Sequence, residues 1–317
     1  MRKIFIILIL VFFISGCYDY RELNDMSVVT GIGINYKDDK YIVSLEVTKS
    51  IKDGSSNEIE TIVYTGENKV LADAFLEAKN SSDKYVYMEH VNILLVSESL
   101  CKKGIGDIVD YIVRDTTINS NYYMAVVDDP GKVFEIKQEN DSTSNVITNT
   151  INYYLDDTSF DDLDIMSSYM INKNDDIAIP FITLDKDKVT FNKVAYFNGD
   201  KMVGKIDSKL YTLLRLNSDN EIIIKICCEG LIKEINKKVD MEKDDSYNYL
   251  SRIISKDMEE DIRLFLDETL TNNSDLLGLQ DKYYKKYKKI MNNINYKVDV
   301  NLKINKNGII YGVLYDK

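Results

Sequence analysis

Two runs of β-branched and apolar residues near the start of the chain predict a β-hairpin. The runs cover residues 27–36 and 41–49 and are separated by the charged residues 37–40. Alternating apolar and polar positions on either side of a short polar turn are typical of paired antiparallel strands. Residues 58–65 continue the pattern, so we expect a third strand there.

Apolar residues at helical spacing follow, and then a strand, a helix and a second strand. The spacing predicts a helix over residues 68–79. Strands are expected over residues 91–96 and 122–127 with one helix over residues 98–114 between them, which is the arrangement of a βαβ unit. The residues expected to face the core are Val70, Ala74, Phe75, Leu76 and Ala78 in the first helix, and Ile105, Ile108, Val109, Ile112 and Val113 in the second.

The second half of the chain mixes helices and strands without strict alternation. Helices of modest length are expected over residues 131–172. Strands over residues 177–184 and 189–197 lead to a turn at Asn198-Gly199-Asp200, and a short helix is expected to follow. The remaining expected elements are a strand over residues 221–232, a helix over 246–270, a helix from about residue 275, and strands over 294–304 and 309–314.

This order of elements predicts an α+β protein of several domains, with mixed sheets and packed helices. About 300 residues exceed what one compact core usually holds, so two or three domains are expected. We place a first domain at residues 17–188, long enough for two subdomains, and a second at residues 189–317. Both follow a segment of different character, residues 1–16.

That first segment has the composition of an export signal. Basic residues at positions 2 and 3 precede the apolar residues 4–14, and Ser15-Gly16 stands directly before Cys17. Roughly 20 apolar residues are needed to cross a bilayer, so the segment is too short to remain as a span. Cleavage before Cys17 resembles processing at the lipobox of bacterial lipoproteins, in which the thiol receives a diacylglyceryl group. The alternative is a soluble secreted protein with a chance cysteine at this position.

The charge of the chain argues against nucleic acid as a partner. Without residues 1–16, 38 basic residues stand against 52 acidic ones, which gives a formal charge of −14. Such a chain is repelled by nucleic acid and by anionic lipid. Electrostatic attraction therefore cannot hold it to a membrane, whereas two acyl chains on Cys17 provide a durable anchor.

Three further cysteines, Cys101, Cys227 and Cys228, do not form a disulfide framework. Their number is odd, and adjacent side chains in a strand point to opposite faces. We expect all three to be small packing residues. A vicinal redox pair at residues 227 and 228 is the alternative.

The residues needed for catalysis or for a cofactor are largely missing. His90 is the only histidine, which excludes multi-histidine metal sites, and no Gly-x-Ser-x-Gly motif accompanies it. We expect it to be structural or to face a partner. Gly31 and Gly33 lack the third glycine of a dinucleotide fingerprint, and glycines in a strand more often mark a bulge or a close backbone approach. We therefore assign no catalytic, cofactor-binding or metal-binding residue, although a carboxylate pair for glycoside hydrolysis stays open among the 52 acidic residues.

Two local charge clusters leave alternatives open. Five aspartates at residues 156–164 suggest calcium but lack the loop glycine of an EF-hand, and acids also favour the start of a helix. Residues 283–289 combine three tyrosines with four lysines, which suits a lipid headgroup or a partner surface. An amphipathic helix with Tyr283, Tyr287 and Ile290 inward is the favoured interpretation.

Several segments, in order along the chain, resemble one family. Residues 16–23 and 29–34 resemble the start of the Ger(x)C family, the C subunits of spore nutrient-germinant receptors. Residues 90–98 look like the central segment of that family. Further similar positions are Gly104-Ile105, Arg114-Asp115, Ala195-Tyr196-Phe197, residues 200–204 and residues 275–279.

The resemblance implies a non-enzymatic lipoprotein, lipidated at Cys17, on the outer face of the inner spore membrane. Such a protein works with a membrane A subunit and a permease-like B subunit in nutrient-triggered germination. A multi-domain mixed α/β structure is also implied. The alternative function is a solute-binding lipoprotein of a transporter, a class with two doubly wound lobes, whereas this chain opens with consecutive strands. An envelope hydrolase is the third alternative.

Overall fold

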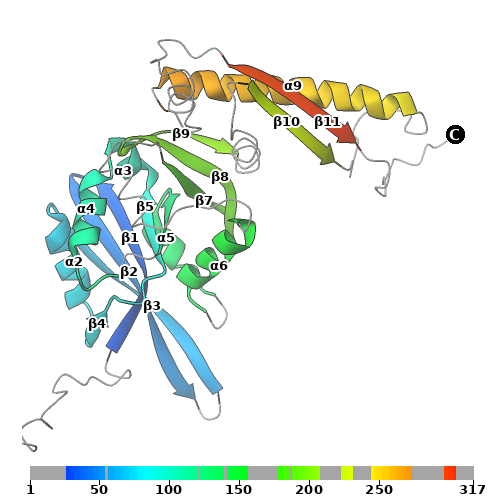
Figure 1. Ribbon diagram of the computed structural model, residues 1–317. Helices are drawn as coiled ribbons and strands as arrows, with labels where there is room; N and C mark the ends of the chain where they lie inside the picture. The colour runs from blue at the N-terminus through cyan, green and yellow to red at the C-terminus, as the bar shows by residue number, and fades with distance from the viewer. Residues whose placement is uncertain are drawn as a thin grey trace, which may run out of the picture.

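The computed structural model describes residues 26–53, 56–119, 122–138, 141–155, 177–185, 188–207, 223–230, 244–272, 274 and 296–304. Its elements are shown in Figure 1. They are β1 (Met26–Lys37), β2 (Lys40–Asp53), β3 (Ser56–Asn68), α2 (Leu71–Asn80), β4 (Tyr85–Tyr87), β5 (Ile93–Ser97), α3 (Glu98–Lys103), α4 (Gly106–Arg114), β6 (Tyr123–Val127), α5 (Pro130–Phe134), α6 (Thr143–Leu155), β7 (Ala178–Asp185), β8 (Lys188–Asn198), β9 (Lys201–Asp207), β10 (Ile223–Gly230), α9 (Asp244–Thr271) and β11 (Lys297–Ile304).

Within these described ranges, nine strands form one mixed sheet. Its order is β3-β2-β1-β5-β6-β7-β8-β9, and β4 pairs with the start of β1. The strands β1 to β3 and β7 to β9 form antiparallel meanders, whereas β1, β5, β6 and β7 are neighbours in parallel. A second sheet pairs β10 with β11 in parallel. The mixture of strands and helices confirms the predicted α+β class.

The predicted hairpins form where the turn residues favour them. Lys37 pairs with Lys40, and the two residues between them, Asp38 and Asp39, have φ angles of 52° and 59°. Two successive residues with positive φ form a turn whose twist matches the twist of the paired strands on either side. Gly199, with φ of 59°, turns the chain between β8 and β9 in the same region. The strand β9 itself is not predicted by the apolar pattern.

The single helix predicted over residues 98–114 is wrong, because the chain divides it into α3 and α4. Gly104 lies between the two helices with φ of 128°, a conformation that residues with a Cβ rarely adopt. The apolar stripe is therefore carried mainly by α4, where Ile108, Val109 and Ile112 are buried. Val113, predicted to be inside, is 39% exposed.

The first predicted helix forms as α2, but its buried face differs from the expected one. Leu71, Ala74, Phe75 and Ala78 are buried and lie against the sheet. Two of the expected core residues, Val70 and Leu76, are 53% and 55% exposed. Val70 precedes the helix and Leu76 lies on its outer face, so their apolar side chains do not reach the core.

Helices cover both faces of the nine-stranded sheet, with α2, α3 and α4 on one face and α5 and α6 on the other (Figure 1). The strand β8 has both of its faces buried. Its residues Ala195 and Phe197 belong to the core under α2 to α4, whereas Val194 and Tyr196 belong to a core that includes α9. The alternation of side chains along one strand therefore joins two cores.

Several predictions concern residues outside the described ranges. They are Cys17 and the segment 1–16, the acidic cluster at residues 156–164, the helix from residue 275, the cluster at residues 283–289 and the strand over residues 309–314. The predicted domain boundary at residue 188 falls at the start of β8, which pairs with β7. The division into residues 17–188 and 189–317 stays a prediction.

Candidate functional site

A buried carboxylate lies between β1, β2 and the first turn of α6. Glu46 is 0% exposed, and its two oxygens accept hydrogen bonds from the backbone amides of Thr143 at 2.8 Å and Ser144 at 2.9 Å. The hydroxyls of Thr30, at 3.1 Å, and Ser144 also donate to it. A buried charge is costly unless it is hydrogen-bonded, and the free N–H groups at the start of α6 provide these bonds. We name Thr30, Glu46, Thr143 and Ser144 the Glu46 cluster.

Two glycines of β1 allow α5 and α6 to approach the sheet closely. A Cβ on Gly31 would collide with the Ser144 hydroxyl and lie 2.8 Å from Cζ of Phe134. A Cβ on Gly33 would lie 2.7 Å from Cβ of Pro130. The register of β1 against β2 also shifts between Val29 and Gly31. Both a bulge and a close approach, the two expectations for these glycines, are therefore confirmed.

The segment at residues 90–98 forms a hydrogen bond with the Glu46 cluster. The backbone amide of Asn92 donates to the carbonyl of Thr30 at 2.8 Å, and its side-chain amide donates to Oδ1 of Asn145. The side-chain amide of Asn145 in turn donates to Asp141 at 2.7 Å. His90 lies apart from this network. It is exposed, and its ring packs edge-on against Tyr87 with 5.5 Å between centroids.

A second polar cluster joins α3 to β9. Glu98 forms ion pairs of 2.8 Å with both Lys102 and Lys205. Burial acts to raise the pKa of the Glu98 carboxyl, but hydrogen bonds from Lys102 and Lys205 outweigh burial and hold that pKa below its ordinary value. Beside this pair, the backbone amide of Ile105 donates to the carbonyl of Asp200 at 3.0 Å. We name Glu98, Lys102, Lys205, Ile105 and Asp200 the Glu98 junction.

The β8–β9 hairpin also contacts the C-terminal part of the chain. The ring of Tyr196 packs edge-on against Phe265 with 5.5 Å between centroids. The Ser274 hydroxyl donates to the carbonyl of Phe197 at 3.2 Å, and the Asn198 amide donates to the carbonyl of Asn272 at 2.9 Å. The hairpin is thus held on one side by the Glu98 junction and on the other by α9.

Two family models match the chain, one after the other. The model described as spore germination protein N-terminal domain matches residues 19–184, which is more than half of the chain. The chain belongs to this family of spore germination proteins. A second model, described as spore germination B3/GerAC like, C-terminal, matches residues 215–308.

Proteins similar to this chain include several spore germination proteins. Spore germination protein KC of Bacillus subtilis (strain 168) is 20% identical, over 89% of this chain and 86% of its own length. Spore germination protein A3 of the same organism is 28% identical over 42% of this chain and 38% of its own length. Spore germination protein GerQC of Bacillus cereus is 20% identical over 69% of this chain and 62% of its own length. The crystal structure of the GerBC protein has the same fold, with a TM-score of 0.50, 14% identity, and coverage of 90% of this chain and 99% of that one.

Four of the segments that suggested this spore germination family lie at the two clusters. Residues 29–34 and 90–98 supply Thr30, the β1 glycines and Asn92 at the Glu46 cluster. Residues 98, 104–105 and 200–204 lie at the Glu98 junction. Glu46 itself was not predicted, because its partners Thr143 and Ser144 are 97 and 98 positions away in the chain. One sequence signal exists, since Glu46 stands between the apolar residues of a strand, on its opposite face.

The described part of the molecule holds no group of three or more His, Cys, Asp or Glu side chains suited to a metal ion. An open groove of about 720 Å³ lies between α9 and β11 and is lined by residues such as Cys227, Arg252 and Ser255. Cys101 is buried, as predicted, whereas Cys227 is exposed and the packing role predicted for it is wrong. The side chain of Cys228 lies outside the described residues. No described helix is long and apolar enough to span a membrane.

Proposed function

We propose that the chain is the lipid-anchored C subunit of a nutrient-germinant receptor. It acts with a membrane A subunit and a permease-like B subunit at the outer face of the inner spore membrane. The observation that carries the proposal is the match of both spore germination models, in order, over residues 19–184 and 215–308. The export-signal composition of residues 1–16 and the lipobox-like position of Cys17 support the anchor.

The proposed role is structural and not enzymatic. Glu46 and Glu98, the central carboxylates of the two clusters, are engaged in hydrogen bonds and ion pairs within the chain. Carboxylates hydrogen-bonded and ion-paired in this way stabilise contacts between elements. The relatives are named as spore germination proteins, which favours this role over that of a solute-binding lipoprotein.

Spores that lack this protein test the proposed role. We expect them to lose the response to at least one nutrient germinant, and we expect the wild-type gene to restore it. The strain should carry no second member of the family, because a related subunit would mask the loss. Normal germination of such spores with every nutrient would contradict the proposal.

The anchor is tested separately with Cys17→Ala. This variant is expected to leave the membrane fraction and to lose labelling by radioactive palmitate, because the thiol that would receive the lipid is absent. Cys227→Ala is the matched control, since it removes an exposed cysteine elsewhere in the chain. Full membrane retention of Cys17→Ala would contradict the anchor.

A further inference from the structure

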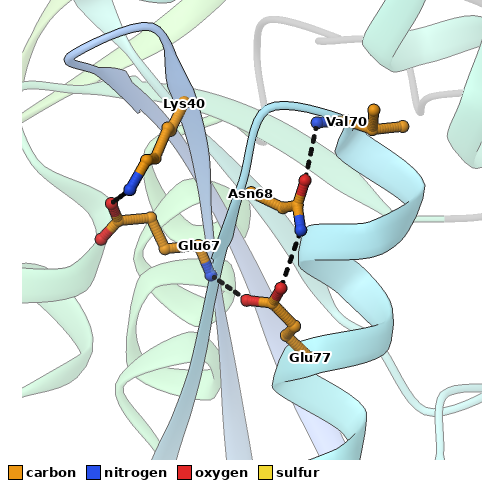
Figure 2. A network of polar contacts seen from close by, with 5 residues as sticks. All are labelled: Lys40, Glu67, Asn68, Val70 and Glu77. Carbon is orange, nitrogen blue, oxygen red and sulfur yellow. Dashed lines mark hydrogen bonds and ion pairs between the residues drawn. The ribbon is translucent and has the colours of Figure 1, made fainter.

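The strand β3 forms one edge of the nine-stranded sheet and, among the described strands, pairs only with β2. The register between them is continuous from the pair Tyr41 and Asn68 to the pair Asp53 and Ser56. In such a ladder, every second residue directs its backbone N–H and C=O toward the neighbouring strand. The residues between them direct theirs away from it. The amide of Glu67 donates to Glu77 of α2 at 3.1 Å, away from β2 (Figure 2). Residues 59, 61, 63 and 65 therefore also present their N–H and C=O groups at the outer edge.

Helix α2 covers only one end of this edge. Figure 2 shows Glu77 accepting from the backbone amide of Glu67 and from the side-chain amide of Asn68, the latter at 2.8 Å. The backbone of α2 lies so close that a Cβ on Gly66 would collide with the carbonyl of Ala74. No hydrogen bond between described residues reaches the outward groups of residues 59, 61, 63 and 65. This open stretch is a template for another extended chain.

The open stretch lies toward the end of the sheet at which the described chain begins. The strand β1 starts at Met26 and pairs Val28 with Thr48, so the last residues of β2 and the first of β3 extend past it. Figure 1 shows this β2–β3 ribbon projecting from that end of the sheet. Met26 stands nine positions after Cys17, a stretch that spans at most about 30 Å when extended. An anchor at Cys17 therefore keeps the ribbon near membrane-embedded proteins.

The charge of the open stretch of β3 indicates which kind of chain can pair with it. Residues 59–65 contain one charged residue, the exposed Glu60, and no lysine or arginine, whereas Glu67, beyond this stretch, is paired with Lys40 at 2.8 Å. A second copy of the chain paired along this edge would bring together two stretches whose one charged residue is acidic, which is unfavourable. An extended segment that carries Lys or Arg would place opposite charges across the new strand pair.

We propose that the edge of β3 at residues 59–65 binds an extended, basic extracytoplasmic segment of a membrane-embedded receptor subunit by strand addition. The segment adds a tenth strand to the sheet and receives its main-chain hydrogen bonds from the outward groups of β3. This inference rests on the proposed function and names the surface through which the subunit joins its partner.

The test compares Thr61→Pro with Thr61→Val in spore membranes. The amide of Thr61 points away from β2, so proline removes a hydrogen bond to the added strand while the β2–β3 ladder remains. Valine keeps the amide and serves as the control. We expect Thr61→Pro to retain about tenfold less membrane-embedded subunit in co-purification than Thr61→Val, with equal thermal unfolding of the two variants.

A photo-crosslinking residue at position 65 tests the same contact without proline. Thr65 is exposed on the open edge, and Leu264, 62% exposed on α9, is the control position. The expected product joins position 65 to a Lys- or Arg-containing segment of a membrane-embedded subunit, with no such product from position 264. Crosslinking to a second copy or to lipid alone, or undiminished co-purification of Thr61→Pro, would overturn the proposal. If the wild-type chain co-purifies with no membrane subunit, the proposed function fails as well.

Discussion

Single glycines decide how closely the segments of this molecule can approach one another. Gly31 leaves room for Ser144 and Phe134, and Gly104 adopts a φ of 128° next to Asp200. At Gly204, a Cβ would collide with the Tyr196 hydroxyl. In each case a methyl group would need the space of an atom from another helix, strand or loop, and packed interiors have little spare volume.

Replacing Gly31 by alanine is expected to destabilise the protein by about 2–3 kcal/mol, because the new methyl group forces α5 and α6 away from β1. The free energy of unfolding in urea measures this effect. Gly131→Ala is the control, since its Cβ would have ordinary contacts of 3.5 Å. Equal stability of the two variants would contradict the close packing described for Gly31.

The cysteines are expected to differ in reactivity. Burial raises the pKa of the Cys101 thiol, and the thiolate is the reactive form, so Cys101 should resist alkylation in the folded protein. Cys227 is exposed and should react readily. Peptide mass spectrometry after a short iodoacetamide treatment distinguishes the two, and treatment in denaturant should label both. Labelling of Cys101 at the rate of Cys227 under native conditions would be inconsistent with the buried position.

At the scale of helices and strands, local chemistry predicted much of the architecture. The turn residues Asp38 and Asp39, the apolar run of β5 and the glycine at position 199 each favour the element that the structure contains. The division between α3 and α4 was missed because Gly104 is tolerated in a helical pattern, and the Asp200 carboxylate that a Cβ at this position would meet is almost a hundred residues away. The Glu46 cluster was missed for the same reason, since no local pattern indicates which helix start a buried carboxylate will meet.

Glu98→Gln is expected to weaken the contact between α3 and β9, because the ion pairs with Lys102 and Lys205 lose their negative partner. The expected loss is about 1 kcal/mol of unfolding free energy at neutral pH. Glu67→Gln, which affects a more exposed pair with Lys40, is the control and should cost less.

The pH dependence gives a second check on Glu98. Its pKa is lower in the folded protein than the ordinary value of 4.5, so its stabilising effect is present above that value and is lost as the pH falls through the folded pKa. The difference between wild type and Glu98→Gln should therefore shrink under acidic conditions. A difference that grows as the pH falls would contradict the assigned ion pairs.

At the scale of the whole molecule, β8 and β9 connect the large sheet to the C-terminal helix. The hairpin contacts α3 through Lys205 and Glu98, and α9 through Tyr196 and Phe265. A displacement of α9 would therefore act on the same hairpin that contacts the α3 side of the sheet. A hairpin that contacts both α3 and α9 fits a subunit whose proposed role is assembly with membrane partners and not catalysis.

The most direct measurement of that role is crosslinking of the intact protein in spore inner membranes, followed by purification through this chain and identification of the partners. If the chain has the proposed role, we expect recovery of a permease-like membrane subunit together with the A subunit, and a lower yield with Cys17→Ala. Recovery of transporter components without these subunits, or of this chain alone under conditions that preserve other membrane complexes, would contradict it.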